Sequence, residues 1–147
     1  SSVVLHSVVN RLMANKKELK DYYYSPESAY EQSGGQLIHQ EDKEFMDSVT
    51  AIIKENLAQD TLRPELIADK LGMNTRALYR RFKKISLLTP SDFIKDYRMM
   101  HAARLLVTTN LSVQEIIYQV GISNKSYFYR EFSAKYGVTP GEYRRMQ

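Results

Sequence analysis

The chain has 147 residues and no cysteine, so it holds one domain with an appended segment, and disulfide bonds and thiolate metal sites are excluded. Hydrophobic residues make up 43% of it, enough for a packed core, and no apolar run approaches the roughly 20 residues that span a bilayer. Residues 1–59 carry six Lys or Arg and nine Asp or Glu, whereas residues 60–147 carry fifteen and eight. This basic C-terminal part favours a DNA binder, although a solvated basic face gives the same pattern.

Residues 1–24 are predicted to form an N-terminal helix, and residues 25–41 a linker. Ser25-Pro26 ends the helix, because the residue before proline avoids the helical region. The linker is polar and contains Gly34-Gly35. The helix carries an apolar stripe that needs a partner, either the domain itself or another protein surface. The stripe consists of Val4, Leu5, Val8, Val9, Leu12 and Met13.

The next segment is predicted to hold three helices. The first runs from about Asp42 to Leu57, and the second begins at Pro64, a residue favoured at the first helical position. Gly72 turns the chain, and Asn74 is expected to cap the third helix. The third helix is amphipathic, with Leu78 and Phe82 expected inside and Arg76, Tyr79, Arg80 and Lys83 in solvent.

A long helix of about seventeen residues is predicted from Pro90, with Thr89 as its cap. The pattern of two short helices around a glycine turn then repeats. Ser112 and Glu115 form a capping box, Gly121 turns the chain, and Ser123 is expected to cap the following helix. That helix buries Phe128 and Phe132 and ends at Gly137, and a last short helix starts at Pro140. Arg144 and Arg145 are expected to form a solvated tail, with a phosphate contact as the alternative.

The repeat gives two helix-turn-helix units, at residues 68–90 and 117–140. No segment alternates with period two, so the fold is predicted to be all-α. It should contain two helix-turn-helix subdomains joined by the long linking helix and preceded by the N-terminal helix and linker.

Residues 45–147 resemble the DNA-binding domain of AraC-type transcription regulators. The family's strongest signature matches the second repeat, through Gly121-Ile122-Ser123-Asn124-Lys125-Ser126-Tyr127-Phe128-Tyr129-Arg130-Glu131-Phe132 and then Tyr136-Gly137-Val138-Thr139-Pro140-Gly141-Glu142-Tyr143-Arg144. The resemblance implies seven helices in an AraC-type domain at residues 42–147. Leu87 departs from the pattern, since the family usually has glycine after the first recognition helix. We therefore expect a different turn there, because leucine is unfavourable in the left-handed conformation.

The first forty-five residues have a weaker similarity, to the segment after a phospho-receiver domain in hybrid two-component regulators. The chain starts with Ser1 rather than Met, as expected of a fragment of a longer protein or of a trimmed chain. The similarity implies receiver and histidine kinase modules upstream in the same protein. Double-stranded DNA is the main expected partner, and a homodimer of the full-length protein and RNA polymerase are further candidates. We expect a cytoplasmic protein, whose full-length form is membrane-anchored if the missing upstream regions carry an anchor.

The second helix of a helix-turn-helix unit enters the major groove, where residues on its exposed N-terminal half reach base edges. Arginine suits this position because its planar fork matches guanine O6 and N7 together. Thr75 and Asn124, at the helix starts, are better placed for phosphates. The candidate base contacts are Arg76, Tyr79, Arg80, Lys125, Ser126, Tyr129 and Arg130. Each arginine has an alternative role as partner of a nearby acid, and each tyrosine as a packing residue.

Two functions remain open at this point. The first is the DNA-binding output domain of a two-component transcription regulator, which reads two adjacent major-groove segments. The second is a helical interaction or dimerisation module that lacks specific DNA binding. An enzyme is not expected, because the sequence has no glycine-rich phosphate loop and no nucleophile–base pattern. No cofactor or metal is expected either, since His6, His39 and His101 are scattered without ligand spacing.

Overall fold

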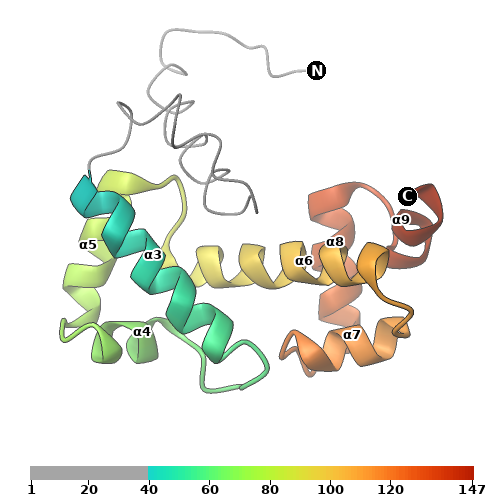
Figure 1. Cartoon of the computed structure of the whole chain (residues 1–147), viewed down its shortest axis with the longest axis horizontal. Helices are drawn as coiled ribbons and strands as arrows, with labels where there is room; N and C mark the ends of the chain where they lie inside the picture. Colours follow the sequence, from blue (N-terminus) through green and yellow to red (C-terminus); the bar gives the residue numbers. More distant parts are fainter. Residues whose placement is uncertain (1–39) are drawn as a thin grey trace, which may run out of the picture.

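The computed structural model describes residues 40–147, and every regular element in that range is a helix. Helices α3 (Gln40–Glu55), α4 (Pro64–Lys70) and α5 (Thr75–Ile85) lie at one end of α6 (Pro90–Thr108), and α7 (Val113–Gln119), α8 (Lys125–Tyr136) and α9 (Pro140–Met146) lie at the other (Figure 1). The predicted all-α fold of two helix-turn-helix units joined by a linking helix is confirmed. The predicted N-terminal helix and linker lie outside the described residues, apart from positions 40 and 41, which already belong to α3.

The helix starts follow from local side-chain chemistry. Asn74 Oδ1 accepts a hydrogen bond from the Ala77 N–H at 2.8 Å, and Thr89 Oγ1 accepts one from the Asp92 N–H at 3.1 Å. Reciprocal capping boxes open α7, from Ser112 and Glu115, and α9, from Thr139 and Glu142. These contacts satisfy N–H groups that have no partner inside the helix.

The turn of the second unit differs from its prediction. Asn124, rather than Ser123, caps α8, and its Oδ1 accepts from the Tyr127 N–H at 2.9 Å. Ser and Asn are both good caps, so adjacent positions cannot be separated from sequence. Two residues lie between the turn glycine Gly121 and this cap, against one between Gly72 and Asn74. The two units therefore share a fold but differ by one residue in the turn.

The turn after α5 contains no left-handed residue, in line with the leucine at position 87. Ser86 ends α5 in an extended conformation, with φ −131° and ψ 164°, and its hydroxyl accepts a hydrogen bond from the Leu88 N–H. Among the described residues, only glycines have a positive φ. The helix α8 ends differently, in Gly137 with φ +77°. The chain thus leaves α5 without the left-handed residue that glycine would supply.

Each unit has its own hydrophobic core, and α6 contributes to both. Phe93, Ile94 and Tyr97, in its first half, pack in the first core with residues such as Leu78 and Phe82. Its second half contributes Met99, Ala102, Ala103 and Leu106 to the second core. The other buried members of that core are Ile116, Ile117, Val120, Phe128 and Phe132. Because α6 is buried in two places, it acts as a shared structural element rather than a free linker.

A single buried cation joins the two units. Arg98 lies at the middle of α6, only 8% exposed, between the two cores. Its Nη1 donates to the carbonyl oxygens of Leu57, after α3, at 3.1 Å, and of Val120 and Gly121, in the α7–α8 turn, at 2.6 and 2.8 Å. Its Nη2 lies 3.4 Å from the Gln59 oxygen. One guanidinium therefore connects the backbones of both units.

The predicted solvated arginine tail is wrong for Arg144. Its Nε donates to the Leu106 carbonyl at 2.9 Å and its Nη2 to the Thr109 carbonyl at 3.2 Å, at the end of α6. The acceptors are carbonyls that a helix C-terminus leaves without internal partners. Arg145 is exposed. Arg144 thus fastens α9 to α6 rather than extending into solvent.

The turn glycines give a matched test of this packing. Gly72 and Gly121 have φ values of +71° and +77°, but a Cβ at Gly72 meets nothing within 4 Å, whereas one at Gly121 collides with the Leu57 carbonyl oxygen and the Arg98 guanidinium. Gly72→Ala should cost about 1–2 kcal/mol of conformational strain. Gly121→Ala adds overpacking of about 1–3 kcal/mol. Urea denaturation of both variants measures the difference, and equal losses would contradict the Arg98 contact.

Candidate nucleic-acid interface

The second helix of each unit, α5 or α8, buries one face and exposes the other. Leu78 and Phe82 in α5, and Phe128 and Phe132 in α8, are fully buried, as predicted. Six of the seven candidate base contacts are exposed, namely Arg76, Tyr79, Arg80, Lys125, Ser126 and Arg130. This is the amphipathic arrangement that a helix needs to pack on its own core and still present side chains to a groove.

The two candidate tyrosines have different surroundings. Tyr79 is 40% exposed, and its hydroxyl lies 3.3 Å from Ser91 Oγ, in the first turn of α6. Tyr129 is half-buried, packs on the second core and meets Phe128 edge-on, with ring centroids 5.9 Å apart. Tyr129 is therefore largely a packing residue, the alternative that the sequence left open, whereas Tyr79 remains at the surface.

Two of the three candidate arginines, Arg80 and Arg130, are each the sixth residue of their helix. Arg80 makes no ion pair within the described residues. Arg130 lies 3.9 Å from Glu131, and its guanidinium sits 5.6 Å from the centroid of the Tyr127 ring. An exposed pair of this length contributes little to stability. Both guanidinium groups can therefore turn toward an external anion.

The predicted phosphate contacts lie at the helix starts. Thr75 is the first residue of α5 and is half-buried. Asn124 uses its Oδ1 for the cap, so its amide nitrogen remains as a donor. Asn74 has the same capping role in the first unit. Each unit thus presents a helix N-terminus, with its partial positive charge, beside an asparagine amide.

The charge of the two helices is strongly positive. The α5 sequence carries five Lys or Arg and no Asp or Glu, and α8 carries three and one. A surface of this sign attracts a polyanion and speeds its association.

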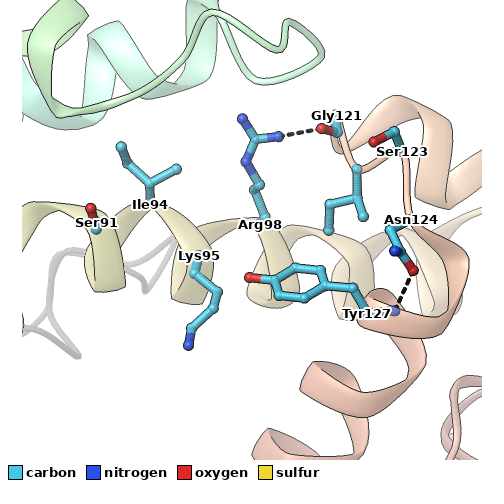
Figure 2. Close-up of a pocket in the computed structure, with 9 residues that line it drawn as sticks. Ser91, Ile94, Lys95, Arg98, Gly121, Ser123, Asn124 and Tyr127 are labelled. Carbon is cyan, nitrogen blue, oxygen red and sulfur yellow. Dashed lines mark hydrogen bonds between the residues drawn. The ribbon is translucent and has the colours of Figure 1, made fainter.

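A cleft of about 300 Å³ lies between α6 and the start of α8. Figure 2 shows Ser91, Ile94, Lys95 and Arg98 coming from α6, with Tyr127 of α8 extending toward them. Gly121, Ile122, Ser123 and Asn124 complete it. Burial lowers the pKa of Arg98 below its usual value, an effect that the nearby Tyr127 opposes. The sequence alone did not indicate Ser91, Lys95, Arg98 or Tyr127 as site residues. For Arg98, the one feature that could have indicated burial is its position in a helix with apolar residues on several faces.

Other kinds of site receive no support in the part of the chain that the structure describes. Residues 40–147 contain no group of three or more His, Asp or Glu that could hold a metal. Over the same residues, no helix has both the length and the apolar character needed to cross a membrane.

The comparisons identify the family. The model of a helix-turn-helix domain matches residues 67–146. The structure of the C-terminal domain of the two-component response regulator yesN from Fusobacterium nucleatum is 31% identical, with a TM-score of 0.61, over 67% of this chain and 96% of that one. The chain belongs to the AraC-type helix-turn-helix family, whose members regulate transcription by binding DNA.

Two curated relatives extend the comparison. The bifunctional transcriptional activator/DNA repair enzyme AdaA of Bacillus subtilis is 34% identical over 71% of this chain and 49% of its own length. Histidine kinase P4 of Formosa agariphila is 29% identical over 69% of this chain and 7% of its own length. The chain therefore spans about half of one relative and a small part of the other.

Two substitutions at Asn124 separate its role as a helix cap from the predicted contact with a phosphate. Asn124→Ala should lower the free energy of unfolding by about 1 kcal/mol, through loss of the cap. Asn124→Asp keeps the cap and its stability, because Asp caps as well as Asn, but it places a negative charge where a phosphate is expected. Thermal unfolding and DNA binding should therefore respond differently, with Asn124→Asp stable but weaker on DNA. Undiminished DNA affinity of this variant would remove Asn124 from the phosphate contacts.

Proposed function

We propose that this chain carries the DNA-reading output domain of a two-component transcription regulator, and that α5 and α8 occupy two adjacent major-groove segments of one duplex. The observation that carries the proposal is the pair of basic, exposed recognition helices, which belong to two units that pack on α6 and are bridged by Arg98. Positive charge supplies affinity for any DNA, and the exposed arginines supply groups that distinguish bases.

The length of α6 supports the adjacent-groove geometry. Its 19 residues span about 28 Å at 1.5 Å per residue. Successive major-groove segments on one face of a duplex are about 34 Å apart. The linking helix is therefore long enough to support two units about one helical turn apart.

The two-component context is supported by the relatives. The yesN structure is the C-terminal domain of a two-component response regulator, and P4 is a histidine kinase. In the proposed full-length protein, receiver and kinase modules precede residue 1 and form a homodimer. Residues 1–24 connect these modules to the DNA-binding domain and stabilise the dimer. Contact with RNA polymerase and a cytoplasmic location remain predictions. The absence of an enzymatic activity is also a prediction, since the relative AdaA combines a transcriptional activator with a DNA repair enzyme.

The alternative, an interaction module without specific DNA binding, depends on the apolar stripe at residues 4–13, which lies outside the described residues. Mobility shifts at rising salt distinguish the two functions. The proposed domain should lose affinity steeply with salt, with a log–log slope of several units. A flat response would leave only the interaction module.

Substitution of Arg80 and Arg130, which occupy equivalent positions in α5 and α8, tests base recognition directly. Arg80→Ala and Arg130→Ala should each weaken binding to the cognate site by about 1–3 kcal/mol, while binding to random DNA changes much less. Folding should be nearly unchanged, since Arg80 is exposed and the Arg130 side chain is 67% exposed. Lys54→Ala, at an exposed position of α3, is the control for loss of one surface charge. Equal losses on cognate and random DNA would assign the arginines to phosphates instead.

A further inference from the structure

The cleft beside α8 lies between the two recognition helices. On the α5 side, Tyr79 reaches the cleft residue Ser91 through the 3.3 Å contact of their hydroxyl oxygens. On the α8 side, Asn124 and Tyr127 line it directly. Residues of α6 occupy the space between, with Lys95 and Arg98 one turn apart (Figure 2). Polar side chains of α6 and α8 thus lie between the two recognition helices, together with Ile94 and Ile122 of the same cleft.

We propose that this cleft binds the phosphate backbone of the DNA strand that passes between the two reading segments, with Lys95 as the ionic contact and Ser91 and Tyr127 as hydroxyl donors. The inference rests on the proposed function, because it places a third contact region between the two recognition helices. Between successive major-groove segments on one face of a duplex, the minor groove and its bordering phosphates face the protein. The middle of α6 is the part of the domain that meets them.

The charges around the cleft support an anionic ligand. Its lining contains two cations, Lys95 and Arg98, and no carboxylate. The acids that act on Lys95 are Glu131, whose Oε1 is 3.3 Å from Nζ, and Asp92 in the first turn of α6. Partial burial favours the neutral amine, but the hydrogen bond and charge of Glu131 outweigh it and raise the pKa of Lys95. Lys95 is therefore positively charged at neutral pH.

Lys95 is also free to change partner. Its side chain is 41% exposed, and an ion pair with that exposure is weak enough for a phosphate to compete with Glu131. Arg98 cannot move in this way, because its Nη1 is occupied by backbone oxygens, and it contributes a fixed positive charge.

The chain offers a matched control for Lys95. Lys135 forms a second ion pair between the same two helices, with Nζ 2.7 Å from Asp96 Oδ1, but it does not line the cleft. Lys95→Gln and Lys135→Gln each remove one positive charge and one α6–α8 ion pair. Only Lys95→Gln should reduce the log–log salt slope of DNA binding, by about 0.9 for one lost phosphate contact. Its affinity should fall several-fold, alike on cognate and random DNA, because phosphates carry no base information.

The assay uses the 147-residue chain and two duplexes, one natural and one with neutral methylphosphonates in place of the phosphates between the two segments. On the neutral duplex, wild type and Lys95→Gln should bind with equal affinity, because the contact that distinguishes them is absent there. Lys95→Arg should restore the slope, and thermal unfolding checks that all variants are folded. If Lys95→Gln and Lys135→Gln behave alike, or the neutral duplex preserves the difference between wild type and Lys95→Gln, this inference is wrong while DNA binding stands. If wild type shows no salt-dependent DNA binding, the proposed function itself fails.

Discussion

The arrangement of the two units depends on the hydrogen bonds of one buried guanidinium. Arg98 is an 8% exposed cation without a carboxylate among its hydrogen-bond acceptors, so carbonyl dipoles from two separate backbone segments stabilise its charge. Hydrogen bonds to a charged group contribute roughly 1.5–3 kcal/mol, about twice a neutral one. Since Leu57 follows α3 and Gly121 lies in the turn before α8, these bonds connect the first unit to the turn that precedes the second recognition helix. Glycine is needed at position 121, because any Cβ there would meet the guanidinium and the Leu57 carbonyl oxygen.

Around this connection the two units have different surfaces. The first presents α5 with five cations and a surface tyrosine that touches α6, whereas α8 has one acid and a tyrosine that packs on its own core. Two ion pairs, Lys95–Glu131 and Lys135–Asp96, hold α8 against α6, and Arg144 fastens α9 to its end. The second unit is therefore linked to α6 by polar contacts as well as by its buried core.

Features that depend on local chemistry could be predicted from sequence, because neighbouring residues determine them. The caps at Asn74 and Thr89, the capping box at Ser112 and the buried pairs Leu78–Phe82 and Phe128–Phe132 are of this kind. Contacts between distant segments could not. Arg98 and Arg144 bond carbonyls 22 to 41 and 35 to 38 positions away, and any backbone oxygen is an equivalent acceptor in a sequence. The choice of Asn124 over Ser123 as cap depends on the length of a turn, which composition does not encode. Specific DNA contacts of the exposed side chains remain predictions.

The most direct measurement of the central claim compares a duplex that carries both recognition segments with one that carries a single segment, for wild type, Arg98→Lys and Arg98→Met. If Arg98 sets the relative placement of α5 and α8, Arg98→Met should lose most of the advantage of the double segment while it still binds the single one, and Arg98→Lys should retain part of it. Circular dichroism confirms that each variant is helical before it is assayed. A folded Arg98→Met variant that keeps the full preference for the double segment would contradict the account.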